Sequence, residues 1–323
     1  KLTNDIDLTK VEAWTPIGAM TNTYGDYVKF GGTFDGDGHT ISNLKIDDNA
    51  KQYQALFGYV SGTIKNLTVA GTVTTSSSYA AGIVAYGKPA TLENCTNEVK
   101  VTATAKGYAA GVIAYVGSGS VVTNCTNTAE ISGCGDFVGG IGATVISSSI
   151  KNCLNRGTIS NSGKPTSMAY CTGGIAGGIS SSTPTSMISM CGNTGTVTST
   201  LKRTGGIVGS LGGNVEKSFN TGTITGIYGV GGIAGDAAEK KSSISDCYNQ
   251  GNVTAQSPTS KFTDKYTKGV GGIIGSVSSN TIIDITLSNC YSTGYITSTS
   301  KLSDITCGGV IGNSSGKTYS GAE

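Results

Sequence analysis

The chain is poor in charged residues and in proline, and each shortage excludes a class of protein. Asp, Glu, Lys and Arg make up 13% of its 323 residues, and the formal net charge is +2, so nothing favours nucleic acid or an acidic membrane surface as a partner. Only 5 residues are proline, although 50 are glycine, which argues against collagen and against a proline-rich linker. No apolar run reaches the roughly 18 residues that a transmembrane helix needs.

The scarcity of histidine limits the metal and acid–base chemistry that the sequence can support. His39 is the only histidine, so the zinc motif His-Glu-x-x-His is absent, and no Cys-x-x-Cys pair offers another zinc site. The 20 acidic residues form no acidic column at one phase of the sequence repeat. We therefore predict no enzymatic activity, no metal and no cofactor. A carbohydrate-active β-helix enzyme, which works through clustered carboxylates, is the alternative.

What the chain has instead is a short glycine-rich element that recurs along most of its length. Its commonest form is Gly-Gly-Ile-x-Gly, as in Gly205–Gly209. The second residue of each copy is Ala55, Gly82, Gly111, Gly140, Gly174, Gly206, Gly232, Gly272 or Gly309, which gives steps of 26 to 40 residues. A repeat of this length is typical of a solenoid, and it is too short in most copies for a propeller blade.

A second element alternates with the first and reads Ile-x-Asn-Cys-x-Asn-x-Gly-x-Ile-Thr in its commonest form. Its central column is Leu44, Leu67, Cys95, Cys125, Cys153, Cys191, Ser218, Cys247 and Cys290. Asn is frequent just before this column and two positions after it, and Asn at a bend tolerates a left-handed backbone. Each repeat therefore contains at least two short strands separated by Gly, Asn and Ser turns.

These patterns predict an all-β fold, a right-handed parallel β-helix of about nine coils. No stretch of the chain holds a sustained helical apolar period, and the right-handed winding is inferred by analogy with parallel crossovers. We expect a single domain over residues 1–323, with an N-terminal opening coil over 1–50 and the repeats over 51–323. The sequence begins in mid-pattern at Lys1, so we also expect a mature or trimmed fragment.

The repeats resemble the bacterial GLUG motif, a Gly-Leu-any-Gly repeat of secreted and cell-surface proteins. Leu56-Phe57-Gly58 and Ile207-Val208-Gly209 occupy the place of the motif core, and the run from Phe30 to Leu44 resembles the opening coil before such repeats. The resemblance implies an extracellular or cell-surface β-solenoid that is adhesin-like. Such repeats also occur in non-catalytic regions of immunoglobulin-A-cleaving metalloproteases.

The nine cysteines invite a disulfide interpretation, which β-helix geometry disfavours. Six of them share the central column, where neighbouring side chains stack in parallel about 4.8 Å apart, whereas the Cβ atoms of a disulfide lie about 3.8 Å apart. We predict buried free thiols in this column. Cys134, Cys171 and Cys307 lie outside it and cannot be paired from the sequence.

One acidic loop could be mistaken for a calcium site. Asp35-Gly36-Asp37-Gly38-His39 alternates carboxylates with glycine, but the twelfth position of an EF-hand loop counted from Asp35 is Ile46 rather than Glu. We predict a tight turn between two strands, with His39 entering the second strand.

Aromatic residues offer the best candidates for ligand binding. Tyr59, Tyr86 and Tyr115 share one phase of the repeat, and Tyr79, Tyr108 and Phe137 share another. Phe219, Tyr248 and Tyr291 directly follow the central column and should point outward by strand alternation. Phe262 and Tyr266 lie in a basic and aromatic insertion between Ala255 and Lys268. Exposed aromatic stacks bind sugar rings or proteins, although stacking between coils alone would also explain them.

The sequence therefore favours a non-enzymatic bacterial module for adhesion or ligand display, secreted or at the cell surface. We expect a monomer whose partner is a host or cell-wall glycan or protein, with no nucleic acid and no transmembrane segment. The alternatives are the carbohydrate-active enzyme and the non-catalytic repeat region of a larger surface metalloprotease. The sequence identifies neither the ligand nor the means of anchoring.

A thiol titration tests the cysteine prediction. Denatured, unreduced protein should show at least six free thiols, because the stacked column geometry does not suit disulfide formation. A count below six would contradict it.

Overall fold

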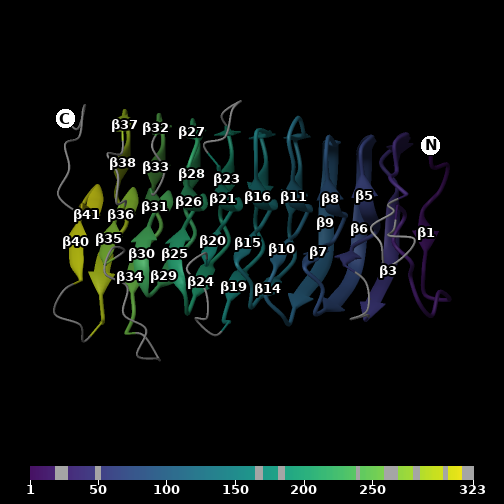
Figure 1. Ribbon diagram of the computed structural model, residues 1–323, viewed down its shortest axis with the longest axis horizontal. Helices are drawn as coiled ribbons and strands as arrows, with labels where there is room; N and C mark the ends of the chain where they lie inside the picture. The colour runs from purple at the N-terminus through teal and green to yellow at the C-terminus, as the bar shows by residue number, and fades with distance from the viewer. Residues whose placement is uncertain are drawn as a thin grey trace.

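The computed structural model describes residues 1–18, 28–47, 52–163, 170–180, 186–237, 241–257, 268–278, 284–300 and 305–314. Within these ranges the protein contains 41 β-strands and no helix. The strands wind into a rod along which the chain advances steadily from one end to the other (Figure 1). The all-β prediction is confirmed.

The strands form three sheets, of which the largest has 23 strands and is called the outer wall below. The strands of the outer wall are β1 (Ile6–Asp7), β2 (Thr33–Asp35), β3 (Thr40–Asp47), β6 (Thr63–Thr75), β9 (Thr91–Ala103), β12 (Val121–Thr123), β13 (Thr126–Asn127), β14 (Ile131–Gly133), β17 (Ser149–Lys151), β18 (Leu154–Asn155), β19 (Ile159–Asn161), β22 (Met187–Ser189), β23 (Gly192–Asn193), β24 (Val197–Ser199), β27 (Asn214–Glu216), β28 (Phe219–Asn220), β29 (Ile224–Gly226), β32 (Lys241–Ser245), β33 (Tyr248–Asn249), β34 (Val253–Ala255), β37 (Asp284–Ser288), β38 (Tyr291–Ser292) and β39 (Ile296–Ser298).

The other two sheets have nine strands each and are called the first and second inner sheets. The first inner sheet contains β4 (Tyr53–Gln54), β7 (Tyr79–Ala81), β10 (Tyr108–Ala110), β15 (Phe137–Gly139), β20 (Cys171–Gly173), β25 (Lys202–Gly205), β30 (Tyr228–Gly231), β35 (Gly269–Gly271) and β40 (Thr306–Gly308). The second contains β5 (Phe57–Val60), β8 (Val84–Gly87), β11 (Ile113–Val116), β16 (Gly142–Val145), β21 (Ala176–Ile179), β26 (Val208–Leu211), β31 (Ala234–Ala237), β36 (Ile274–Val277) and β41 (Ile311–Ser314).

Neighbouring strands in each sheet are parallel and come from successive coils. Strand β8, for example, pairs with β5 and β11, so that Val84 aligns with both Phe57 and Ile113. Nine strands in each inner sheet correspond to nine coils, and the predicted parallel β-helix is confirmed. Its right-handed sense stays a prediction. The buried apolar core is continuous from Leu8 to Leu287.

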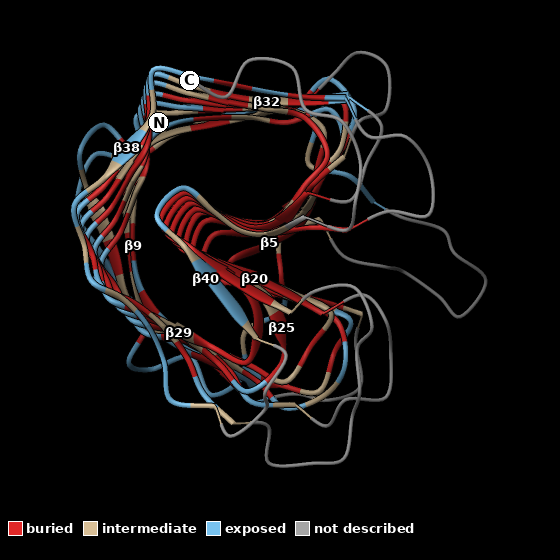
Figure 2. Ribbon diagram, turned by 90° about the vertical axis from the view of Figure 1, so that its left-hand side faces the viewer, coloured by how far each residue is buried: buried red, intermediate tan, exposed pale blue. Residues whose placement is uncertain are grey.

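Each coil has an unusual cross-section, because the two inner sheets fold back into it. The outer wall curves around one side, and the inner sheets converge at a turn that points toward that wall (Figure 2). The turn is the second and third residues of each glycine-rich element, such as Gly82 and Ile83 between β7 and β8. Ile83 and Val84 are fully buried and face the wall residues of the core, which explains the apolar third position of the repeat.

The glycine at this turn is required because it touches an asparagine of the outer wall. A Cβ at Gly82 would overlap Oδ1 of Asn97, and one at Gly111 would overlap the side chain of Asn127. The same contact recurs at Gly140, Gly174, Gly206 and Gly232, which meet Asn155, Asn193, Asn220 and Asn249. The two sequence elements of the repeat are therefore the two halves of one packing contact.

The asparagines in this contact form a buried ladder along the rod. In each step the Nδ2 of one asparagine donates to the Oδ1 of the next, at 2.7 Å from Asn97 through to Asn249, and Asn249 donates to Ser292 Oγ at 3.1 Å. From Asn97 to Asn249 each Nδ2 also donates to the backbone carbonyl two residues later. The side-chain amides are thus paired although they are fully buried.

A second asparagine column, just before the cysteine column, supplies the predicted left-handed corners. Asn94, Asn124 and Asn152 have φ of 53° to 55°, and Met190, Lys217 and Asp246 adopt the same conformation in later coils. From Asn66 to Asn152 their amides donate toward the N-terminus, and Asp35 accepts the last bond at 3.0 Å. This largely exposed ladder runs in the opposite direction to the buried one.

Replacement of a buried ladder asparagine should destabilise the rod more than replacement of an exposed one. Asn193→Ala removes bonds to Asn155, Gly195 and Asn220, and the buried groups left without partners should cost about 3 kcal/mol. The control Asn124→Gly keeps a residue suited to φ of 55° and should cost about 0.5 kcal/mol. Urea unfolding followed by circular dichroism measures both, and equal losses would contradict the prediction.

Candidate functional site

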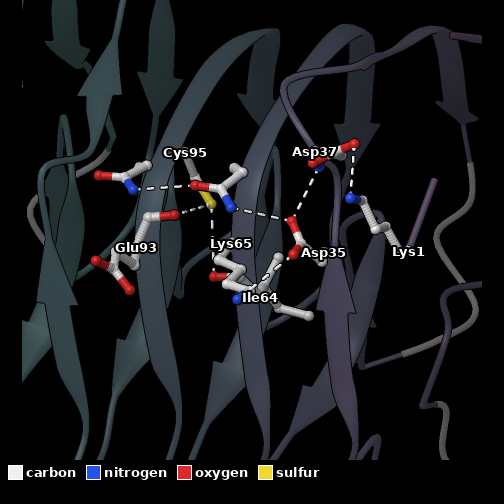
Figure 3. Close-up of polar contacts among 9 residues, drawn as sticks. Lys1, Asp35, Asp37, Ile64, Lys65, Glu93 and Cys95 are labelled. Atoms are coloured by element: carbon white, nitrogen blue, oxygen red, sulfur yellow. Dashed lines mark hydrogen bonds and ion pairs between the residues drawn. The ribbon is translucent and has the colours of Figure 1, made fainter. Parts of the chain in front are cut away.

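The acidic loop is a tight turn, as predicted, and its carboxylates are occupied by protein groups. Asp37 and Gly38 have φ of 51° and 85°, and the loop joins β2 to β3. Asp35 accepts bonds from Asn66 Nδ2 at 3.0 Å and from the Asp37 N–H at 2.9 Å, and Lys65 lies 3.4 Å away (Figure 3). These contacts, led by the Asn66 bond, lower the pKa of Asp35 to about 2.

The surroundings of the turn complete its ionic contacts. Lys1 Nζ lies 3.0 Å from Asp37 Oδ2, and His39 Nδ1 lies 3.1 Å from Asp5 Oδ1. Across the described part of the chain, no three His, Cys, Asp or Glu side chains gather as a metal site would require. The loop is a corner of the opening coil.

The cysteines of the central column are free thiols, as predicted. The placement of Leu44 in this column was wrong, because Leu44 aligns with Gly71 and not with Leu67. Cys95, Cys125, Cys153, Cys191 and Cys247 are buried and form no disulfide, and Cys290 is half-buried. Backbone N–H groups donate to the sulfur of the next coil at 3.4 Å, from Cys125 to Cys153 and from Cys153 to Cys191.

Ser218 explains why serine can replace cysteine in this column. The Cys191 N–H donates to Ser218 Oγ at 3.1 Å, and Ser218 Oγ donates to the Glu216 carbonyl at 2.8 Å. Cys95 Sγ makes the equivalent bond to the Glu93 carbonyl at 3.3 Å (Figure 3). A thiol or hydroxyl in this column therefore pairs backbone groups as well as filling the core.

The remaining three cysteines are also free. Cys171 lies between the inner sheets beside Arg203, and burial raises the pKa of its thiol to about 11. Cys134 is half-buried, and burial raises its pKa as well. Cys307 is exposed in β40. The raised pKa values mean that Cys171 and Cys134 are protonated at neutral pH and are poor nucleophiles.

Two columns of aromatic residues that are separate in the sequence repeat meet in the structure and form one cluster between the inner sheets. The tyrosine cluster contains Tyr53, Tyr59, Tyr79, Tyr86, Tyr108, Tyr115 and Phe137. Rings of successive coils stack, as at Tyr86–Tyr115 with centroids 4.3 Å apart, and the two columns meet edge to face, as at Tyr79–Tyr86 at 5.4 Å. Burial raises the pKa of Tyr86 and of Tyr108.

Further along the rod the same columns become polar. Arg203 replaces the ring of the first inner sheet and Asp236 that of the second, and Arg203 Nε lies 2.9 Å from Asp236 Oδ2. The Asp236 side chain is 0% exposed and also accepts from Ser278 Oγ at 2.7 and 2.8 Å. A buried ion pair therefore occupies the layer between the inner sheets that aromatic rings fill in earlier coils.

The spacing of the inner sheets accounts for this change. In the coils of Tyr79 and Tyr108 the facing residues are alanines, such as Ala81 and Ala85, whose methyl groups hold the strands apart. In the later coils both are glycines, and a Cβ at Gly209 or Gly235 would collide with the backbone of the first inner sheet. The sheets approach until their backbones touch, which leaves no ring-sized layer between them.

The outward aromatic column is present as predicted. Phe219, Tyr248 and Tyr291 align across β28, β33 and β38, with ring centroids 5.5 Å apart at each step and interplanar angles of 11° and 9°. Tyr291 is 53% exposed, and the other two rings are half-buried within the stack. Of the predicted candidates, these three residues form a surface.

The other two candidates, Phe262 and Tyr266, lie outside the described residues. The longest insertions of the repeat, at 161–170, 255–268 and 298–306, each fall between the last wall strand of one coil and the first inner sheet of the next. Their shared phase follows from this order of strands.

A concavity beside the opening coil contains acidic residues that the sequence analysis did not select. Glu12, Trp14, Lys45 and Asp47 contribute to its lining, and its volume is about 330 Å³. Trp14 Nε1 donates to the Leu56 carbonyl at 3.1 Å, which fixes the indole against the rod. These residues are dispersed in the sequence and share no repeat phase, so periodicity could not reveal them.

The fold has a solved counterpart. A Bacteroides ovatus protein provisionally named an immunoglobulin A1 protease superposes with a TM-score of 0.54 over 91% of this chain and 76% of its own, at 20% identity. That identity shows a shared β-helical fold alone. Halomucin of Haloquadratum walsbyi is 35% identical over 109 residues, which are 32% of this chain and 1% of halomucin.

No family model matches the chain. Its fold is that of a β-helical repeat protein, and the GLUG resemblance rests on its sequence motifs. The chain spans about 1% of the length of halomucin. In the described residues we find no helix that is long and apolar enough to cross a membrane.

Removal of one partner of the buried ion pair should lower the free energy of unfolding more than removal of both partners. Arg203→Met leaves Asp236 charged and buried, which should destabilise the protein by about 3 kcal/mol, and the double variant Arg203→Met/Asp236→Leu should lose less than the single variant. The control Lys100→Met removes an exposed pair with Glu130 and should cost below about 1 kcal/mol. Thermal and urea unfolding test the order of these three stabilities.

Proposed function

We propose that this protein is a non-enzymatic module for adhesion or ligand display, presented at a bacterial surface or secreted. The observation that carries the proposal is the aromatic stack of Phe219, Tyr248 and Tyr291, which faces solvent on a rigid wall. Apolar side chains gathered in a row at the surface are typical of a site that binds a ligand or a partner. A continuous rod of stacked coils is suited to hold such a surface at a distance from an attachment point.

Two resemblances support the proposed location. The GLUG-like motifs are similar to repeats of secreted and surface proteins, and part of the chain is similar to halomucin. Both support a role outside the cytoplasm. We propose a monomer, since all nine coils bury their cores within one chain.

The catalytic alternatives have less support. A β-helical carbohydrate-active enzyme would need clustered carboxylates, and the concavity near Trp14 presents two, Glu12 and Asp47, beside Lys45. A surface metalloprotease could contain this chain as a non-catalytic repeat region, as the name of its Bacteroides ovatus counterpart allows. That alternative would gain from a His-Glu-x-x-His segment in the same reading frame.

An adhesion assay tests the proposal against these alternatives. Beads coated with the purified chain should be retained on immobilised mucin or on bacterial cell-wall polymer, whereas albumin-coated beads should not. The same chain should release no new reducing ends from a polysaccharide panel and should leave immunoglobulin A intact. Loss of bead retention, or appearance of either product, would contradict the proposal.

A further inference from the structure

The aromatic stack has a definite tilt, which determines what it offers to a ligand. In the wall column that contains Phe219, the preceding coil has Gly192, and a Cβ there would overlap the far edge of the Phe219 ring. The ring therefore leans back over the preceding coil. Its successors repeat the tilt, since the three planes are within 11° of one another at each step.

Because the tilted rings are offset from one another, each ring covers only part of the face of its neighbour. Their centroids are 5.5 Å apart, which exceeds the coil spacing of about 4.8 Å and is the separation of offset rather than face-to-face stacks. The last ring, Tyr291, has the largest open area, with 53% exposure. The surface is a narrow aromatic strip that steps along the rod axis.

Polar side chains border this strip on both sides. The residues two positions before the rings are Lys217, Asp246 and Asn289, and those two positions after are Thr221, Gln250 and Thr293; all six are exposed. Asn289 Nδ2 donates to Asp246 Oδ1 at 2.9 Å, which orients one carboxylate beside the rings. The single cation and single anion cancel, so the borders offer hydrogen bonds without net charge.

We infer that this strip, made of Phe219, Tyr248 and Tyr291 with its two polar borders, binds an uncharged, extended, β-linked oligosaccharide that lies parallel to the rod axis. The inference rests on the proposed function and names its ligand. Sugar rings have an apolar face that packs on aromatic rings and a rim of hydroxyls that the bordering amides, hydroxyls and carboxylate can bond.

The alternative of a protein partner fits the strip less well. The stack is one ring wide and is bounded by polar residues, whereas a protein hot spot is a wider apolar centre shielded from water. Strand addition is not available at β28 and β33, because β28 pairs with β23 and β33, and β33 pairs with β38.

The length of the strip limits the length of the glycan. Earlier residues in the same column are Thr40, Thr68, Thr96, Thr126, Leu154 and Gly192. Among the described residues, aromatic side chains therefore occupy this column in three coils, those of Phe219, Tyr248 and Tyr291. If one sugar contacts each ring, affinity should rise from the monosaccharide to the trisaccharide and then level off.

Isothermal titration of the full chain with β-1,4-linked glucose and N-acetylglucosamine oligomers tests the inference, with oligogalacturonate as the charged comparison. Neutral oligomers should bind, with the length dependence described above. Tyr291→Ala should weaken binding by roughly tenfold, as loss of about 1.4 kcal/mol predicts. Tyr291→Phe should stay close to the parent, because it keeps the ring.

Thr96→Ala is the matched control, since Thr96 occupies the same column outside the strip. It should leave affinity unchanged, and unfolding curves should confirm that each variant is folded. Absence of binding to every neutral oligomer, tighter binding of the charged oligomer, or an unchanged affinity of folded Tyr291→Ala would overturn the inference.

The two proposals can fail separately. If beads coated with the double variant Tyr248→Ala/Tyr291→Ala adhere as well as the parent while oligomers do not bind, adhesion stands and the glycan strip is overturned. If neutral oligomers bind the parent chain with the expected dependence on Tyr291 but coated beads never adhere, the strip stands and adhesion is overturned.

Discussion

A contact between a turn glycine and a buried asparagine organises six of the nine coils, from the coil of Gly82 to that of Gly232. The glycine lacks a Cβ, so the turn between the inner sheets reaches the outer wall at Gly111 and Asn127 and at their counterparts. The asparagine pairs its amide with the next coil and with a backbone carbonyl. A larger residue at the turn would displace the ladder, and an apolar residue in the ladder would leave buried groups unpaired.

This contact leaves two regions of the rod free to vary. Between the inner sheets, alanine or glycine at one pair of positions decides whether the layer accepts tyrosine rings or an Arg203–Asp236 ion pair. On the outer wall, the residue after the cysteine column faces solvent, and it changes from Thr96 in an early coil to Tyr248 in a late one. A substitution at this surface position leaves the packing of the core unchanged, so a binding surface can develop there.

Much of the fold could be predicted from the sequence because a stacked coil converts a repeat into a column. The glycine-rich element predicted the coil number, and strand alternation predicted that Phe219, Tyr248 and Tyr291 share an outward face. Periodicity could not show that Tyr86 meets Tyr79, since their separation in the coil depends on how the inner sheets fold back. It also missed the hydrogen bonds of the Cys153 sulfur, because a column of identical residues does not show which backbone groups lie beside it.

The sequence by itself determined the parallel coils, their number and the stacked columns from Leu67 onward, because these coils repeat the same local turns and apolar positions. It misplaced Leu44, because the opening coil departs from the repeat. Only the tertiary structure decided which columns touch. It placed the glycine turn against the asparagine ladder, brought two tyrosine phases into one layer, and tilted Phe219 over the space that Gly192 leaves open. These contacts join residues of different strands and coils, and their geometry depends on the path of the whole coil.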